Sequence, residues 1–158
     1  MTPAPRQGQW TITAHASLSE IWAVISDSAN LPKWCTFMVK ETTGGQERLG
    51  ARRSCTLDTG GRQGRVHERC IEYEPPRRIM WTMDDDTLGM TNMLDGLAFG
   101  FELKPLDAKR TEIVFEQYWK PRTLAAKILA PLVLRRQMSR TNTRLLAHLR
   151  DFVDHKLV

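Results

Sequence analysis

The sequence lacks a long hydrophobic run. None of its 158 residues fall in an apolar stretch near the ~20 residues that a membrane-spanning helix needs. The first eight residues also lack the apolar core of a signal peptide. The length suits one domain with its own core. We therefore expect residues 1–158 to form a single cytoplasmic domain, with residues 1–8 as a frayed leader.

Cysteine is scarce, and its pattern excludes several chemistries. The three cysteines, an odd number, form no CxxC pair and no zinc spacing. We predict that they are reduced and mostly buried, as small apolar side chains. The four histidines do not cluster with acids or cysteines. The sequence therefore predicts no metal site, and we expect no cofactor.

Acidic residues are nearly missing from the C-terminal quarter. From residue 120 onward there are nine basic residues and two acids, a net charge of +7, which leaves about −2 for residues 1–119. Such a face can attract nucleic acid, an anionic membrane or an acidic partner. No aromatic-studded basic strand and no helix-turn-helix motif is present, so we expect no nucleic-acid partner. The favoured interpretation is a solvated helix face; the alternative is transient contact of this basic C-terminal helix with an anionic membrane.

Apolar residues recur at spacings of three and four in residues 127–155, which predicts one long amphipathic helix. Its apolar stripe consists of Leu134, Met138, Thr141, Leu145, Leu149 and Phe152. The preceding residues predict strands and turns. The helix must therefore bury its stripe on the sheet that those strands make.

Seven segments have the alternation or the β-forming composition of strands. They are residues 10–16, 37–43, 51–58, 65–74, 78–83, 90–104 and 111–119. Two short helices follow the first strand, one capped by Ser17 or Ser19 and one at residues 31–34. Residues 84–86, three aspartates, predict a solvated turn. Tight connections require antiparallel pairing. The prediction is an α+β fold in which a seven-stranded curved antiparallel sheet wraps around the long C-terminal helix.

Several motifs resemble the START/Bet v 1-like superfamily (SRPBCC), the helix-grip proteins of polyketide cyclase/dehydrase and lipid-transport type. The resemblance is carried by residues 19–27, 31–34, 49–53, 68–69, 73–78 and the 145–149 register of the final helix. It spans nearly the whole chain and implies the helix-grip fold. It says less about function, because this scaffold serves many roles.

The middle strands are most similar to bacterial relatives of the plant abscisic-acid receptors and to the smaller polyketide cyclases. That resemblance implies that Glu68 faces a ligand cavity, and that Glu116, in the Glu-Gln-Tyr sequence 116–118, faces it too. The chain departs from the receptors where they hold the ligand carboxylate with lysine. Thr36 or Phe37 falls there. Binding of abscisic acid is therefore not implied.

If Glu68 points inward, strand alternation predicts the rest of the lining. Glu116 is added to this set because the resemblance implies it. The expected ligand-binding residues are Arg53, Cys55, Leu57, Val66, Glu68, Trp81, Met83, Met93, Asp95, Glu116, Met138, Thr141 and Leu145. A mostly apolar lining with a few polar groups is typical of a small-molecule site. Either Arg53 pairs with Glu68, or one acid is protonated and ready for proton transfer. Trp22 and Trp34 are expected to be core anchors.

The leading hypothesis is a protein that binds a small hydrophobic or amphipathic molecule, such as a lipid, an isoprenoid or an aromatic polyketide-like compound. The alternative is a cyclase, aromatase or dehydratase that uses the pocket acids and Arg53 to position a polyketone, although no catalytic residue can be assigned. A third hypothesis concerns residues 124–134, an apolar segment followed by arginines that would dock on anionic lipid. The more ordinary interpretation is that this segment starts the helix and packs on the sheet.

Overall fold

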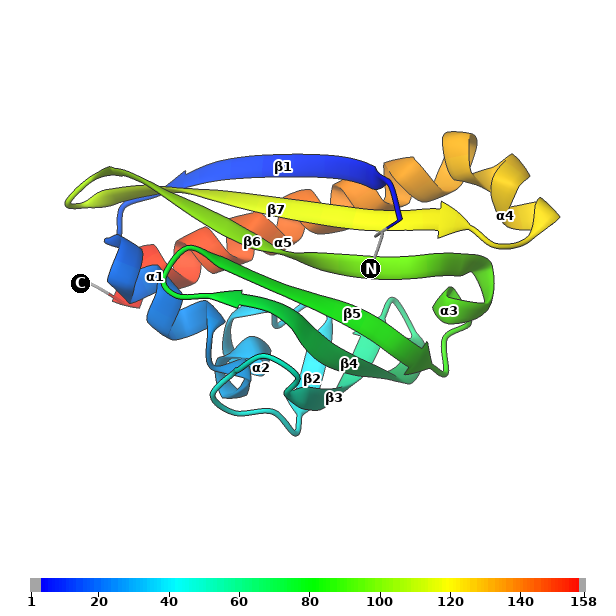
Figure 1. Cartoon of the computed structure of the whole chain (residues 1–158), viewed down its shortest axis with the longest axis horizontal. Coiled ribbons are helices and arrows are strands. Elements are labelled where there is room, and N and C mark those ends of the chain that lie inside the picture. The colour runs from blue at the N-terminus through cyan, green and yellow to red at the C-terminus, as the bar shows by residue number, and fades with distance from the viewer. Residues whose placement is uncertain (1–3, 157–158) are drawn as a thin grey trace.

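A strongly curved sheet of seven antiparallel strands wraps around a long C-terminal helix (Figure 1), which confirms the predicted fold. The computed structural model describes residues 4–156. The strand order in the sheet is β1-β7-β6-β5-β4-β3-β2. The strands are β1 (Arg6–Ala14), β2 (Val39–Thr42), β3 (Arg52–Thr59), β4 (Arg62–Glu74), β5 (Arg78–Asp86), β6 (Leu94–Asp107) and β7 (Arg110–Pro121).

Short helices fill the connection between β1 and β2, close to the predicted positions. They are α1 (Leu18–Ile25), the 3₁₀ turn η1 (Ser28–Asn30) and α2 (Leu31–Trp34). The Ser17 side chain accepts from the Glu20 amide, and the Glu20 carboxylate accepts from the Ser17 amide. This capping box satisfies two amides that the first turn of a helix leaves without partners. Pro32 lies at the start of α2, where its missing N–H costs nothing.

Three local predictions need correction. β1 begins at Arg6, which pairs with Tyr118 of β7, so residues 6–8 are not a frayed leader; residues 1–3 lie outside the described residues. Residues 84–86 are the end of β5 rather than a turn. Residues 90–93 form the helix α3 (Met90–Met93) instead of the start of a strand. Its first turn is held by the Asp86 carboxylate, which accepts hydrogen bonds from the amides of Met90 and Thr91.

The C-terminal helix begins three residues earlier than predicted and has three parts. They are α4 (Leu124–Leu129), the π-helical segment η2 (Ala130–Leu134) and α5 (Arg135–Lys156). Pro131 lies in η2 and cannot donate a backbone hydrogen bond. The Arg135 amide reaches back five residues to the Ala130 carbonyl, the pattern of a π-bulge. The bulge shifts the phase between α4 and α5, so the two parts need not bury the same face.

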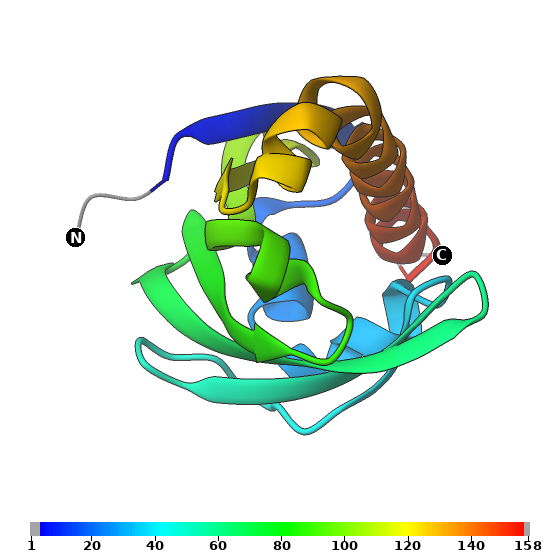
Figure 2. The same ribbon diagram turned by 90° about the vertical axis from the view of Figure 1, so that its right-hand side faces the viewer.

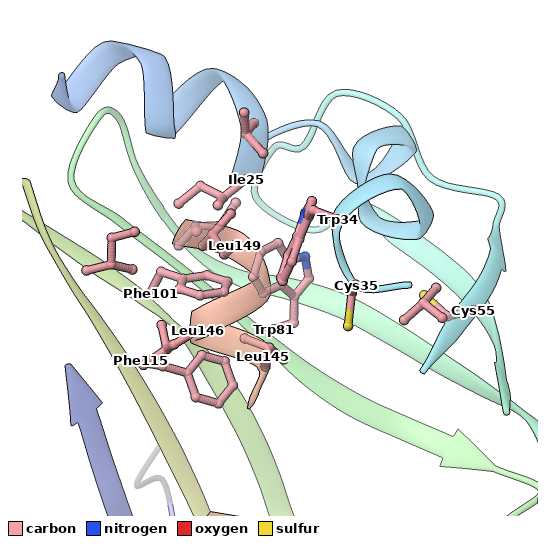
Figure 3. Packing of buried hydrophobic residues seen from close by; sticks show 14 of the residues in the cluster. Ile25, Trp34, Cys35, Cys55, Trp81, Phe101, Phe115, Leu145, Leu146 and Leu149 are labelled. Carbon is pink, nitrogen blue, oxygen red and sulfur yellow. The ribbon is translucent and has the colours of Figure 1, made fainter. Parts of the chain in front are cut away.

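The solid part of the core lies toward the C-terminal end of α5 (Figure 3). Leu146, Leu149 and Val153 of α5 are almost fully buried there. The rings of Trp81, Phe101 and Phe115 stand together beside this helix, with the Phe101 and Phe115 centroids 5.1 Å apart. Toward the other end of α5 the side chains no longer fill the space between helix and sheet.

Candidate functional site

A cavity of about 370 Å³ lies between the concave face of the sheet and α5. Its wall is mostly apolar. The structure places eleven of the thirteen predicted site residues on this wall: Arg53, Cys55, Leu57, Val66, Glu68, Trp81, Met83, Met93, Met138, Thr141 and Leu145. The volume falls in the range of small-molecule sites, which span roughly 300–1,000 Å³. That these side chains contact a ligand stays a prediction.

The cavity opens at one end of the sheet. Among the lining residues, Thr59, Arg62 and Gln137 are exposed to solvent, and Met90 and Leu134 are half-buried. These residues come from the β3–β4 hairpin, from α3 and from the end of η2 with the start of α5. The opening therefore lies between these three elements, and Gln137 lies at its rim.

A buried polar network sits in the wall at the opposite end. Arg53 is 5% exposed, and its Nε donates to Glu68 Oε1 over 2.8 Å. Its Nη1 donates to Ser28 Oγ over 3.0 Å, and Ser28 donates in turn to the buried carboxylate of Glu47. The guanidinium lies 4.1 Å from the centre of the Trp81 ring, in cation–π contact. The pairing of Arg53 with Glu68 is therefore the arrangement that occurs, of the two that the sequence left open.

The network holds its central charge despite burial. Burial lowers the pKa of Arg53, but the negative charge of Glu68 and its hydrogen bond to Arg53 raise the pKa by more than burial lowers it. The pKa of Arg53 therefore lies above its ordinary value. Arg53 and Glu68 face each other directly across β3 and β4. A buried charge without a partner costs several kcal/mol. Each of these two groups therefore depends on the other, and together they give the cavity wall one fixed polar anchor.

Glu116 does not line the cavity, contrary to the prediction. Phe115 and Gln117 line it, and successive side chains of a strand point to opposite faces. Glu116 therefore lies on the convex face of β7, where it is still 5% exposed. Its carboxylate accepts from Arg78 Nη2 over 3.2 Å and from the Tyr118 hydroxyl. The acid that the resemblance placed inside is one residue out of phase, and Gln117 takes the inward position.

Asp95 is also outside the cavity, because β6 carries a bulge. Gly96 has a φ of 64°, and the register with β7 shifts between Asp95 and Ala98. The extra residue resets the alternation, so Leu94 and Leu97 both face the cavity although they are three residues apart. Asp95 points outward and accepts from Arg122 Nε over 2.7 Å.

Sequence reasoning missed the part of the wall that comes from the short helices and from the residues just before β2. Asp27, Ser28, Trp34 and Met38 line the cavity, so Trp34 is a wall residue as well as a core anchor. Their irregular backbone carries no two-residue or 3.6-residue period from which an inward face could be predicted. Asn142 was missed beside the predicted Thr141. Its amide donates to Gln117 Oε1 over 3.2 Å, and both residues line the cavity.

The cavity wall offers no activated thiol. Burial raises the pKa of Cys35 to about 12 and that of Cys55 to about 11. A thiol is a nucleophile as its thiolate, so both are poor nucleophiles near neutral pH. Among residues 4–156, no three side chains of His, Cys, Asp or Glu are grouped so that they could hold a metal ion. The wall supplies shape, apolar contact and a few polar groups, chiefly the Arg53–Glu68 pair and the Asn142–Gln117 pair.

The curved sheet, the long helix that it wraps around and the cavity between them define a helix-grip protein of the START/Bet v 1-like superfamily. The chain belongs to the polyketide cyclase / dehydrase and lipid transport family, whose model matches residues 8–151. This confirms the resemblance carried by the sequence motifs. Among curated proteins, no sequence matches the chain significantly.

Solved structures share the fold at low sequence identity. The chain is similar to the Zhui aromatase/cyclase of a Streptomyces species, with 15% identity, a TM-score of 0.73 and coverage of 96% of this chain and 94% of that one. It is similar to norcoclaurine synthase of Thalictrum flavum, with 16% identity, a TM-score of 0.71 and 99% of both chains covered. A START superfamily protein of Mycobacterium smegmatis gives 13% identity, a TM-score of 0.67 and coverage of 96% and 97%. At such identity these likenesses speak for the fold alone.

Proposed function

We propose that the protein binds a small hydrophobic or amphipathic molecule in the cavity between the sheet and α5. The observation that carries this proposal is the 370 Å³ cavity, whose wall is apolar except for a few buried polar groups. Met83, Met93 and Met138 give the wall flexible side chains that can adapt to different apolar shapes. The family's lipid-transport and polyketide members make a lipid, an isoprenoid or an aromatic polyketide-like compound the candidate classes.

The ligand would lie with its polar end at Arg53. That guanidinium is fixed by Glu68, Ser28 and the Trp81 ring, so it offers donors in one orientation. A hydroxyl or carbonyl oxygen suits it better than a full carboxylate, because Glu68 and Glu47 already surround the single cation with two acids. The three cysteines are buried and free, which fits a reducing compartment, and we place the protein in the cytoplasm.

The test starts with native mass spectrometry of the protein as purified, which would reveal a retained small molecule. A panel of fatty acids, isoprenoids and aromatic polyketones is then added, and the melting temperature is measured. A ligand at about 100 times its Kd should stabilise the folded state by about 2.7 kcal/mol. Met138→Trp fills the cavity from α5 and should abolish the shift, whereas Arg140→Trp, at an exposed position on the same helix, should keep it. No shift with any compound would contradict the proposal.

A second candidate is an enzyme of the cyclase, aromatase or dehydratase kind. What favours it is that the pair of Arg53 and Glu68 lies in the cavity wall, where it could position a polyketone and accept a proton. With Asp95 and Glu116 outside, Glu68 is the buried acid on this wall among the described residues. Glu68→Gln should then abolish turnover of a polyketone while binding persists. If the unmodified protein bound the polyketone but did not convert it, this second candidate would be excluded and only the binding function would remain.

A further inference from the structure

Residues 124–134, which we call the apolar end segment, turn large apolar side chains toward solvent. Within residues 4–156, seven large hydrophobic side chains are exposed, and five of them lie in this segment: Leu124, Ile128, Leu129, Leu132 and Val133. Their exposed fractions run from 44% for Leu129 to 75% for Leu124. The expectation that this segment packs on the sheet is therefore wrong for these five side chains. A cluster of this kind marks an interaction surface.

The segment buries small side chains and exposes large apolar ones, which is the reverse of an ordinary surface helix. Ala126 and Ala130 are its buried residues, at 1% and 3% exposure, while Leu124, Ile128, Leu129, Leu132 and Val133 are exposed. A helix that served only the core would bury its large residues and expose its small ones. The Thr123 cap and the hydrogen bonds from Arg122 to Asp95 and to the Thr91 carbonyl fix the segment in this orientation.

The charged residues in and next to the segment along the chain are all basic. Residues 120–150 contain eight basic side chains and no acid. Lys120, Lys127 and Arg136 are exposed and form no ion pair in the described part of the chain. Exposed leucines between unpaired cations are typical of elements that lie in the surface of an anionic bilayer, with the apolar side chains among the lipid and the cations on the headgroups.

We propose that the apolar end segment is a docking surface for an anionic lipid bilayer. A second copy of the chain fits it less well, because a two-fold contact through this segment would bring Lys127 and Arg136 of one copy toward the same cations of the other. An anionic membrane satisfies both features of the surface at once.

The docking surface adjoins the opening of the cavity. Leu134, the last residue of the segment, lines the cavity, and the exposed rim residues Arg62 and Gln137 lie at the same opening. Figure 2 views this end of the molecule, and both α4 (yellow to orange) and α3 (green) lie toward the viewer. A protein docked here would present its cavity to the bilayer. Docking on a bilayer is a separate proposal from ligand binding in the cavity. Vesicle binding is measured without added ligand, so the experiments can contradict one proposal without contradicting the other.

Sedimentation with sucrose-loaded vesicles tests the proposal. The intact protein should bind vesicles that mix phosphatidylcholine with phosphatidylglycerol, bind pure phosphatidylcholine at least tenfold more weakly, and dissociate in high salt. Ile128→Glu combined with Leu132→Glu should reduce binding at least tenfold. Lys127→Gln and Arg136→Gln should each reduce it about fivefold, since each cation near an anionic surface is worth about 1 kcal/mol.

The matched control uses the same chemistry elsewhere on the surface. Leu49 and Leu106 are exposed to a similar degree but lie outside the segment, so Leu49→Glu and Leu106→Glu should bind vesicles as the unmodified protein does. All of these positions are on the surface, and circular dichroism checks that each variant folds. Binding that ignores anionic lipid, or that survives the Ile128 and Leu132 changes, would overturn the proposal. So would a dimer, detected by analytical ultracentrifugation, that those changes dissociate.

Discussion

Arg53 shows how a single side chain can give an apolar cavity a direction. Its guanidinium is held by Glu68 on one side, by Ser28 on another and by the Trp81 face, so it cannot swing away from the wall. A lysine could not reproduce this arrangement, because it lacks the planar fork that bonds in two directions and stacks on a ring. One end of the cavity is therefore polar and rigid, while the methionine-lined remainder is adaptable.

Glu116 gives the first prediction, on the pH dependence of folding stability. Burial raises its pKa, but the hydrogen bonds from Tyr118 and Arg78 lower it more, so the pKa of Glu116 lies below its ordinary value of 4.5. A carboxylate with a lowered pKa in the folded state stabilises that state above its unfolded pKa. This contribution should be complete above about pH 5 and should disappear as the pH falls through the folded pKa. Urea titrations from about pH 6 to pH 3 measure it.

The variant Glu116→Gln removes the titrating group but keeps its shape. The stability difference between the unmodified protein and this variant should shrink as the pH falls below 4.5. Glu112→Gln, on the same strand and without an ion pair in the described residues, controls for the loss of one negative charge. A difference that stays constant across this pH range would show that Glu116 is not stabilised by Arg78 and Tyr118.

At the scale of elements, regular strands were predictable and irregular ones were not. Where β3 pairs with the first part of β4, over residues 52–59 and 62–69, the register is unbroken, and the inward set from Arg53 to Leu57 and from Val66 to Glu68 could be predicted from the hairpin. In β6 the bulge at Gly96 changes which side chains face the cavity. An isolated glycine in a strand pattern can indicate a bulge, but it does not predict which residues face inward on either side of it. In β7 the error for Glu116 came from a family motif, whereas plain alternation from Phe115 puts this side chain outside.

The packing of β6 against β5 gives the second stability prediction. A methyl group added at Gly100 would lie 2.1 Å from the Ile79 carbonyl oxygen and 2.7 Å from the Met80 Cα, both backbone atoms of the neighbouring strand. The strands must separate to admit it, so Gly100→Ala should lower the free energy of unfolding by about 1–3 kcal/mol. Urea denaturation measures the change. Gly45→Ala, where the added methyl meets no atom within 4 Å, should leave stability nearly unchanged; equal losses in both variants would contradict this account.

For the whole molecule, the order of elements carried most of the fold. Six consecutive strands with short connections, preceded by a strand and short helices and followed by one long helix, leave few arrangements other than a sheet wrapped around that helix. The pairing of β1 with β7 makes the first and last strands of the chain neighbours at one edge of the sheet. The outward-facing leucines of residues 124–134 could not be predicted in the same way. They precede or lie within the π-helical segment at Pro131, where the phase of the helix changes, and the regular period of residues 134–152 does not extend through it.

The hollow between sheet and helix also determines how the whole molecule responds to pressure. Pressure favours unfolding because unfolding eliminates internal voids, and the volume change for proteins is about −20 to −100 mL/mol. The cavity has a mostly apolar wall, and whatever part of its 370 Å³ excludes water should make the unfolding volume of this protein more negative. Its sensitivity to pressure should therefore be high for its size when no ligand fills the cavity.

Filling the cavity should make the protein harder to unfold by pressure. In Met138→Trp the larger side chain occupies part of the void, so the unfolding volume should become less negative and the midpoint pressure should rise. Arg140→Trp adds the same ring at an exposed position and should leave the unfolding volume as in the unmodified protein. Tryptophan fluorescence under hydrostatic pressure follows all three proteins. The same unfolding volume in Met138→Trp as in the other two would mean that the space between sheet and helix is not a void in solution, because only a void that unfolding eliminates contributes to this volume.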